Sequence, residues 1–336
     1  MNQVLMVQAN SKLVGPATSI PFNATRAESQ DRPLATQQAA PVELVMLSQP
    51  WGPNDISHYQ NYVYDSTRRQ DTYIYHAELG INKQHEDFQF QQGRRIEWLY
   101  TQRQLELGDG PTESEAPDSD GHSTCTASKA AGRIYGAARQ ATLVVVKMPD
   151  LNVASLVEIF LTIDRDIRYK NRQNRSVVTI SWASTLQVTY PLRPIDVAWN
   201  TMLRRLRGLS RMNVQIVTAA GNNAEKRYAF TRRHRLKVDT APASFKGDST
   251  WPLIVAGNCD RNGRRWPESQ IIGRTDYPQI YAQGVDIQCA SHLSAAGFNT
   301  RTGTSVCQYC LREFWIIADV ASRGTAGWSF GRSDGG

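Results

Sequence analysis

The sequence predicts an α/β protein built on a parallel β-sheet with helices on both faces. Short runs of apolar and β-branched residues recur along the chain, each long enough for one buried strand. Between them lie longer segments whose apolar residues repeat with the period of a helix. Strands that alternate with helices of this length are typical of a parallel sheet, because each helix carries the chain back to start the next strand.

The strand pattern is clearest between residues 72 and 290. It occurs in TYIYHA, TLVVVKM, SVVTISWA, VQIVTAAG, PLIVAGN and VDIQCA, at 72–77, 142–148, 176–183, 214–221, 252–258 and 285–290. Upstream of these, VELVMLSQP (42–50) is the first candidate for a strand or a buried extended segment.

Two segments predict amphipathic helices. In the first, apolar residues follow one another at helical spacing from Val153 to Ile167. In the second, the apolar stripe runs from Ile195 to Leu206. Pro194 suits its first turn and Gly208 its end.

The length of 336 residues and a hydrophobic content of 40% are sufficient for one large domain. Residues 1–41 are rich in Gln, Ala, Ser, Thr and Pro, which predicts a flexible leader or the remnant of a prosegment. We expect the folded domain to cover residues 42–321. The last residues, 322–336, show no core pattern and predict an irregular tail.

Charge, cysteines and hydropathy narrow the functional classes. Lysine and arginine exceed the acidic residues by seven, which does not by itself indicate a nucleic-acid partner. The basic cluster at 226–237 is predicted to be a solvated loop, with a nucleic-acid patch as its alternative. Five scattered cysteines predict no disulfide framework, and the C-x-x-C at 307–310 lacks a second pair for zinc. No apolar run approaches the roughly 18 residues that span a membrane.

Polar residues follow the predicted strands where a parallel sheet gathers its functional groups. Glu78 follows the first strand, and Asn222 follows the strand ending in A-A-G. His122 opens the helix of DGHSTCTASKAAG, in which Asp120 is the predicted capping residue. Ser305 follows Gly303-Thr304. A serine needs a base to become a nucleophile, the base needs a carboxylate to orient it, and an amide can stabilise an oxyanion.

The chain resembles the subtilisin family of serine proteases (subtilases), in a divergent fungal form. The resemblance rests on GHSTCTASKAAGRIYGAARQATLVVVKMPD, SVVTISWAS, IVTAAGNNA and GTS, at 121–150, 176–184, 216–224 and 303–305. It spans roughly 72–310. The order acid, histidine, serine agrees with that of subtilisin.

The resemblance implies a subtilisin-like fold and a serine endopeptidase. It implies that His122 is the general base, Ser305 the nucleophile and Asn222 the oxyanion donor. Glu78 falls on the position of the family's aspartate, and its extra methylene moves the carboxylate. The substrate strand is expected to pair with Ser181-Trp182-Ala183, and Ala219-Ala220-Gly221 to line the pocket for the residue before the scissile bond.

The chain departs from the family at two places. The acid is a glutamate, and Ser305 is followed by Val306-Cys307-Gln308-Tyr309-Cys310 in place of a small residue and a proline. Two alternatives therefore stay open: a catalytically impaired subtilisin-like pseudoprotease that binds extended peptides, and a nucleic-acid-binding protein that uses 226–237.

No cofactor and no metal are expected. The expected partner is a peptide or protein substrate, with no nucleic acid and no membrane, and the protein is expected to be a monomer. The resemblance suggests a secreted or vacuolar location, although the N-terminal residues show no signal-peptide pattern.

Overall fold

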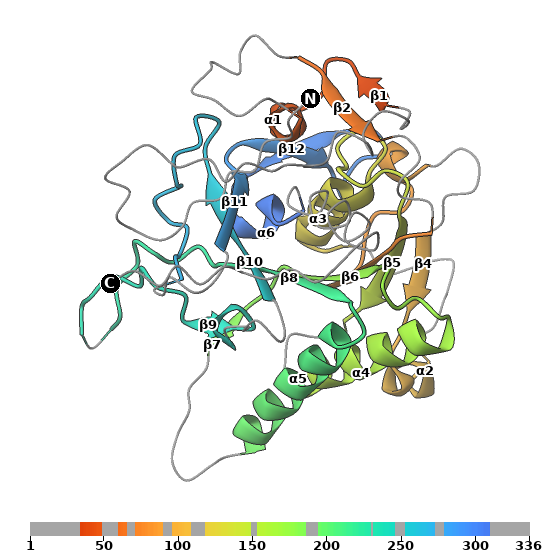
Figure 1. Ribbon diagram of the computed structural model, residues 1–336, viewed down its shortest axis with the longest axis vertical. Coiled ribbons are helices and arrows are strands. Elements are labelled where there is room, and N and C mark those ends of the chain that lie inside the picture. The colour runs from red at the N-terminus through yellow and green to blue at the C-terminus, as the bar shows by residue number, and fades with distance from the viewer. Residues whose placement is uncertain are drawn as a thin grey trace, which may run out of the picture.

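Seven parallel strands form the central sheet of the protein, in the order β11-β10-β8-β6-β3-β5-β4 (Figure 1). This computed structural model describes residues 34–48, 60–65, 71–89, 96–108, 118–148, 153–185, 194–229, 231–245, 253–272 and 279–309. The sheet and its crossover helices confirm the α/β class that the sequence predicts.

Five strands of the sheet lie where the sequence predicts them. They are β3 (Tyr73–Glu78), β5 (Thr142–Lys147), β6 (Ser176–Ile180), β8 (Gln215–Ala219) and β10 (Leu253–Cys259). The two edge strands, β4 (Ile96–Leu99) and β11 (Gln279–Gln283), were not predicted. Both are short and carry polar residues among the apolar ones, as edge strands commonly do.

Residues 285–290 were predicted to form a strand of the central parallel sheet, and this prediction is wrong. Residues Ile287–Ala290 do form a strand, β12, but it pairs antiparallel with β13 (Phe298–Arg301) outside the central sheet. A short alternating run cannot reveal its pairing partner, because the same pattern suits both kinds of ladder.

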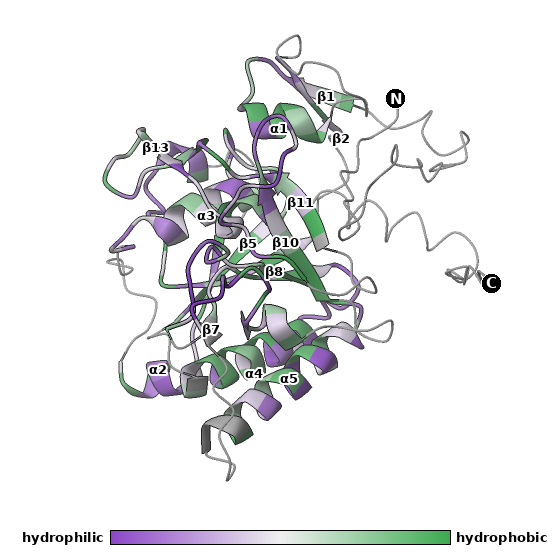
Figure 2. Cartoon of the chain, turned by 90° about the vertical axis from the view of Figure 1, so that its left-hand side faces the viewer, coloured by the Kyte–Doolittle hydropathy of each residue, from purple (hydrophilic) through white to green (hydrophobic). Residues whose placement is uncertain are grey.

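Helices cover both faces of the sheet. The long helices α4 (Val153–Tyr169) and α5 (Pro194–Ser210) lie together on one face, where they share a core with alternate residues of the strands (Figure 2). The other face carries α3 (His122–Ala131) and α6 (Thr304–Cys307). Both long helices were predicted, although α5 continues two residues beyond Gly208.

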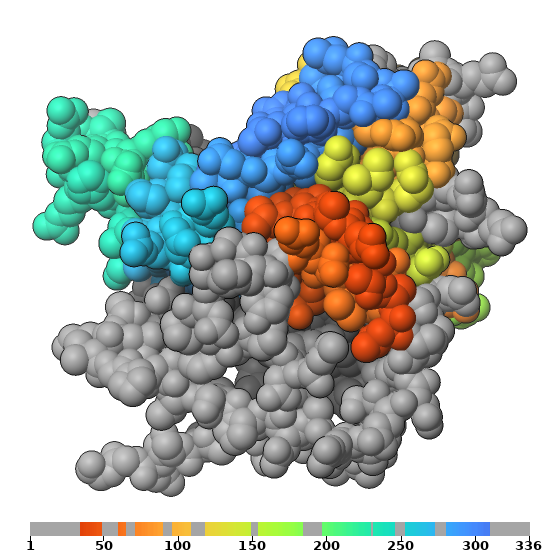
Figure 3. Space-filling model, turned by 90° about the horizontal axis from the view of Figure 1, so that it is seen from above, coloured from red at the N-terminus to blue at the C-terminus, as the bar shows by residue number. Residues whose placement is uncertain are grey.

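An N-terminal unit packs on the α3 side of the molecule. Strand β1 (Leu34–Gln37) pairs antiparallel with β2 (Tyr62–Asp65), and α1 (Val42–Leu47) lies between them in the chain. Figure 3 shows these elements, in red and orange, gathered in one patch. Two predictions are corrected here: residues 34–41 are structured and are no flexible leader, and 42–47 form a helix in place of a strand.

A buried ion pair joins this unit to α3. The ammonium of Lys129 contacts the carboxylate of Glu43, and both side chains are buried. Leu44 and Tyr62 pack beside the pair against Ala137. A buried charge is tolerated only when it is paired, so each residue fixes the position of the other.

The remaining elements are short. They are the helix α2 (Gln102–Glu106), the 3₁₀ turns at Glu86–Phe88 and Ala243–Phe245, and the antiparallel pair β7 (Ser184–Thr185) and β9 (Thr240–Ala241). In the described part of the chain, every helix is too short or too polar to cross a membrane.

Candidate active site

The start of α3 presents His122 at the carboxyl end of the sheet. Asp118, itself buried, accepts hydrogen bonds from the backbone N–H groups of Gly121 and Thr124, at 3.2 and 2.6 Å. Asp120, the predicted cap, accepts from the backbone of His122 itself. Sequence reasoning missed Asp118, which satisfies the free donors of the first turn and carries the larger part of the cap.

The small residues of α3 allow other elements to approach it closely. Every residue of α3 after His122 is buried, and the backbone N–H of Ala290 in β12 donates to the hydroxyl of Ser128 at 3.0 Å. The small side chains therefore let the helix pack tightly against its neighbours. His122 is the exception, since its side chain retains 31% of its exposure.

Glu78 faces His122 from the end of β3. Its Oε1 lies 3.4 Å from Nδ1 of the imidazole, and its side chain is only 5% exposed. Burial alone would lower the pKa of His122, but the hydrogen bond and negative charge of Glu78, with the charges of Asp120 and Asp118, raise it above its ordinary value. The glutamate therefore reaches the ring atom that a triad acid orients.

Thr304 fixes the amide of Asn222 next to Ser305. The Asn222 Oδ1 accepts from the backbone N–H and the hydroxyl of Thr304, at 2.9 and 2.8 Å. Because the Asn222 Oδ1 faces Thr304, the Nδ2 of the same amide points away from Thr304. A Cβ placed on Gly303 would lie 3.2 Å from this Nδ2 and 3.4 Å from the Ser305 Oγ, so both polar atoms border the same backbone position.

A cavity of about 730 Å³ connects these groups. It is lined by His122, Cys125, Ser181, Ala183, Ala219, Gly221, Asn222, Asn223, Lys226, Arg235, Thr240, Trp266, Glu268, Arg301, Thr302, Thr304, Ser305 and Val306. The volume is that of a typical ligand site. Within the described residues, no hydrogen bond joins the Ser305 hydroxyl to the His122 ring; catalytic hydrogen bonds often tighten only when substrate binds.

Two residues of the expected substrate-binding segments lie away from the cavity. Trp182 is in the core on the α4 side, where it packs against Phe160 and its indole N–H donates to the Ala77 carbonyl at 3.2 Å. Ala220 is fully buried in the same core. The other four predicted residues, Ser181, Ala183, Ala219 and Gly221, line the cavity.

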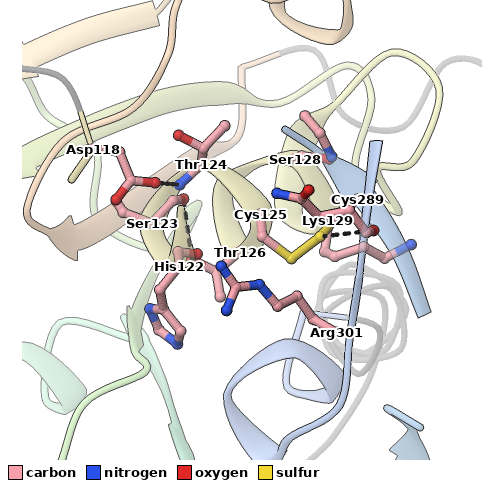
Figure 4. Close-up of a disulfide and its surroundings, with 12 residues drawn as sticks. Asp118, His122, Ser123, Thr124, Cys125, Thr126, Ser128, Lys129, Cys289 and Arg301 are labelled. Atoms are coloured by element: carbon pink, nitrogen blue, oxygen red, sulfur yellow. Dashed lines mark hydrogen bonds between the residues drawn. A yellow bond between two sulfur atoms is a disulfide. The ribbon is translucent and has the colours of Figure 1, made fainter. Parts of the chain in front are cut away.

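A disulfide lies one turn along α3 from His122 (Figure 4). It joins Cys125 to Cys289 of β12, across 164 positions of the sequence. The scattered cysteines were predicted to form no disulfide framework, and this single disulfide was not foreseen. The bond packs with Ile287 and with Val306, the residue after Ser305. Cys259 and Cys307 are buried and form no disulfide with any cysteine that the structure describes, and Cys310 lies outside the described residues.

A buried polar network behind the site was also missed. His76 lies on β3 two positions before Glu78, so both side chains leave the same face of the strand. Its Nε2 lies 3.2 Å from the carbonyl of Ser123, and its Nδ1 lies 3.0 Å from the Tyr309 hydroxyl. A carbonyl can only accept, so in the neutral ring Nε2 carries the proton and Tyr309 donates to Nδ1.

Among the described residues, no group of three or more His, Cys, Asp or Glu side chains could hold a metal ion. What the structure brings together is an acid, a histidine and a serine beside an amide donor. They lie at the carboxyl edge of a parallel sheet, and they are the kinds of group that serine hydrolases use.

The chain belongs to the subtilase family, whose sequence profile matches residues 72–307. It is 27% identical over 264 residues to "Subtilisin-like serine protease Pen ch 13" of Penicillium rubens, and 30% identical over 286 residues to "Subtilisin-like protease 3" of Trichophyton tonsurans. These alignments cover 76% and 81% of this chain, and 55% and 57% of the two relatives. The chain thus spans just over half the length of the curated relatives it matches.

Solved structures show the same fold. A cold-adapted subtilisin-like serine proteinase superposes with a TM-score of 0.60 at 18% identity, covering 85% of this chain and 87% of that one. The nisin leader peptidase NisP from Lactococcus lactis superposes with a TM-score of 0.57 at 14% identity, covering 77% and 80%. At these identities, the likeness establishes the architecture alone.

Proposed function

We propose that this protein is a serine endopeptidase that hydrolyses peptide bonds through Ser305, His122 and Glu78. The observation that carries the proposal is the position of the Glu78 carboxylate, 3.4 Å from the His122 Nδ1, on an imidazole that shares a cavity with Ser305. Orienting Nδ1 leaves Nε2 available to take the serine proton.

In the proposed reaction, His122 accepts the proton of Ser305 as the serine oxygen bonds to the scissile carbonyl carbon. The carbonyl oxygen becomes an oxyanion, towards which Asn222 offers its Nδ2 donor while Thr304 occupies Oδ1. The C–N bond then breaks, and the leaving amine takes the proton from His122. Water attacks the acyl-enzyme by the same route and releases the acid and free Ser305.

The substrate is proposed to lie extended along the ends of β6 and β8. Ser181 and Ala183 on one side, and Ala219 and Gly221 on the other, line the cavity next to His122 and Ser305. Their small side chains leave backbone groups accessible, which suits recognition by strand addition. Trp182, which lies in the core, would contribute its backbone only.

A pseudoprotease that binds extended peptides is the second candidate, and the environment of Glu78 favours it. The contact of the buried Glu78 Oε1 with the His122 Nδ1, at 3.4 Å, is long for a charge-assisted hydrogen bond, and no other described group donates to this oxygen. A loosely held acid orients the histidine less well, and a displacement of about 1 Å can cost on the order of 10²-fold in rate.

Labelling with a fluorophosphonate probe separates the two candidates. We expect the wild type to react at Ser305 and to cleave a casein-type protein substrate, and Ser305→Ala to do neither. Equal labelling of both proteins would refute Ser305 as the nucleophile. An unlabelled wild type that still binds extended peptides would establish the pseudoprotease.

The Glu78→Asp variant tests the fit of the acid. Because β3 already brings the longer side chain to 3.4 Å from the ring, the shorter aspartate is expected to lose contact and lower kcat by about 10- to 100-fold. A large gain in hydrolysis would instead show that the native glutamate impairs the enzyme.

A further inference from the structure

Residues 225–239, of which the structure describes all but residue 230, contain a hairpin that lies beside the cavity and has a high density of positive charge. An antiparallel bridge joins Arg227 to His234, and the N–H of Arg235 donates to the Lys226 carbonyl at 2.8 Å. We call this segment the basic hairpin. Six of its fifteen residues are lysine or arginine and two are acidic, so it supplies four of the seven surplus positive charges of the chain.

The base of the basic hairpin is firmly held. The side-chain amide of Gln270, fully buried, donates to the carbonyls of Arg235 and Lys237 at 2.7 and 2.8 Å. The backbone N–H of Gln270 donates to the carbonyl of Gly221 at 2.9 Å. One residue therefore anchors both the basic hairpin and the segment that leads into Asn222.

Of the six lysine and arginine residues in the basic hairpin, Arg235 alone forms an ion pair with a residue that the structure describes. Arg235 forms a two-bonded ion pair with Asp239, at 2.8 and 3.1 Å, which neutralises it. The other five are exposed and make no ion pair with any residue that the structure describes: Lys226, Arg227, Arg232, Arg233 and Lys237. Figure 3 shows this part of the chain, in teal green, protruding at one edge of the molecule.

The basic hairpin adjoins the proposed reacting groups. Lys226 lines the same cavity as His122 and Ser305, beside the neutralised Arg235, and Arg301 adds a second cation to its wall. Glu268 is the one acidic residue among those lining it. A field of one sign over a cleft raises the local concentration of oppositely charged ligands.

We propose that the basic hairpin is a docking surface that selects substrates with acidic residues just before the scissile bond. The proposal rests on the peptidase function proposed above. The side of the substrate follows from Gln270, which ties the hairpin to Gly221, on the wall expected to hold the residue before the scissile bond. A peptide is favoured over a nucleic acid because Lys226, an unneutralised cation of the hairpin, lines the cavity that contains Ser305.

Paired peptide substrates test the selection. One fluorogenic peptide carries three Asp or Glu residues before the scissile bond, and its partner carries Asn or Gln there. We expect kcat/KM to favour the acidic peptide by about 10-fold at low salt, since several exposed ion pairs act together. At 0.5 M NaCl the preference should shrink to about 2-fold, because salt screens exposed charges.

A charge-reversal variant locates the effect. Arg232→Glu with Arg233→Glu, at the exposed end of the basic hairpin, should abolish or invert the preference. The matched control, Arg204→Glu with Arg211→Glu, reverses two exposed charges on and just after α5 and should keep the preference. An unchanged preference in the hairpin variant would overturn the proposal.

Binding to the Ser305→Ala protein makes the test independent of catalysis. By fluorescence anisotropy, the acidic peptide should bind about 10-fold more tightly than its neutral partner, and the hairpin variant should lose this difference. Equal binding of both peptides refutes the docking surface. Tighter, salt-dependent binding of a 20-nucleotide single strand than of the acidic peptide would overturn it in favour of a nucleic-acid surface. If hydrolysis is absent while selective binding persists, only the peptidase function fails.

Discussion

At the scale of single residues, the charge state of His122 depends on the carboxylate that faces it. Glu78 and two nearby aspartates raise the pKa of His122 in spite of its burial. A general base must be neutral to accept a proton, so hydrolysis requires a pH above this raised pKa. The same interaction stabilises the fold fully below the ordinary histidine pKa of about 6.5, and this contribution is lost as pH rises through the raised value.

Replacing Glu78 by Gln should therefore alter both rate and titration. We expect kcat to fall by about 10⁴-fold, since an amide neither fixes the productive tautomer nor stabilises the imidazolium. The pKa of His122 should fall, which NMR titration of the imidazole in the Ser305→Ala background measures without hydrolysis. The exposed Glu106→Gln substitution is the control. A His122 pKa that does not move in Glu78→Gln would contradict the role of Glu78.

His76 connects the three elements that carry the proposed triad. It lies on the same strand as Glu78 and contacts the backbone carbonyl of Ser123, the residue after His122. It also accepts a hydrogen bond from the hydroxyl of Tyr309, which lies four residues after Ser305. Burial and the negative charge of Glu78 raise the pKa of Tyr309 to about 12, so its O–H remains a donor at all working pH values. We expect His76 and Tyr309 to act as positioning residues.

Tyr309→Phe removes this donor with almost no change in volume. Leaving a buried acceptor without its donor should cost about 1–3 kcal/mol of stability. The displaced segment should lower kcat by about 10-fold with KM nearly unchanged. Thermal unfolding and steady-state kinetics measure the two effects, with the buried Tyr281→Phe as the matched control. A lower melting temperature with an unchanged kcat would show that Tyr309 stabilises the fold without positioning the site.

At the scale of elements, α3 is positioned from both sides by polar contacts within a small-residue interface. Its first turn is capped by Asp118, and its last turn carries Lys129, whose charge is matched by Glu43 of α1. The N-terminal unit is therefore tied to the helix that presents His122. A substitution in α1 is therefore expected to alter the position of α3 and of His122, although Glu43 itself lies outside the cavity.

A double-mutant cycle tests this tie. Glu43→Leu alone leaves the ammonium of Lys129 buried and unpaired, and Lys129→Met alone leaves the carboxylate of Glu43 unpaired; each should cost about 3–5 kcal/mol in urea unfolding. Replacing both residues, by Glu43→Leu and Lys129→Met, should recover most of the loss, because neither charge is then desolvated. If the double variant is as unstable as the single variants, the pair does not act through its charges.

The helices and strands that the sequence predicts correctly are those whose pattern of apolar residues suits only one kind of element. The five inner strands are buried on both faces, and α4 and α5 show the helical period over four turns. The six residues of α1 suit a strand or a helix equally, and only the tertiary contacts of Glu43 and Leu44 decide between them. Likewise, β12 has a strand pattern, but its partner β13 cannot be known from that pattern.

The candidate site was predictable because strand ends gather at one edge of a parallel sheet. Glu78, Asn222 and His122 each adjoin such an end or a helix start, and the structure brings His122, Asn222 and Ser305 to one cavity with Glu78 behind the histidine. The disulfide and the contact of His76 with Tyr309 were not predictable, because each pairs residues more than 160 positions apart.

At the scale of the whole molecule, the Cys125–Cys289 disulfide ties the histidine helix to the strands that precede Ser305. In the chain-entropy model, closing a loop of this length stabilises the fold by about 5 kcal/mol, and measured values are commonly 2–4 kcal/mol. Its contact with Val306 extends this constraint to the nucleophile segment.

Reduction should therefore weaken both the fold and the activity. We expect dithiothreitol to lower the melting temperature and kcat of the wild type, and Cys125→Ser with Cys289→Ser to show the same losses without any further response to the reductant. Peptide mapping under non-reducing conditions identifies the bond directly. Two alkylatable thiols at these positions in the untreated protein would contradict it.

The chain order of the site has a consequence for synthesis. Ser305 follows His122 by 183 residues and belongs to α6, which packs on the α3 face of the sheet that the earlier elements have built. At ordinary rates of translation, roughly 10–40 s separate the appearance of the base from that of the nucleophile. A ribosome making this chain thus exposes the proposed base well before the proposed nucleophile, so the proposed site is complete only after α6 has emerged.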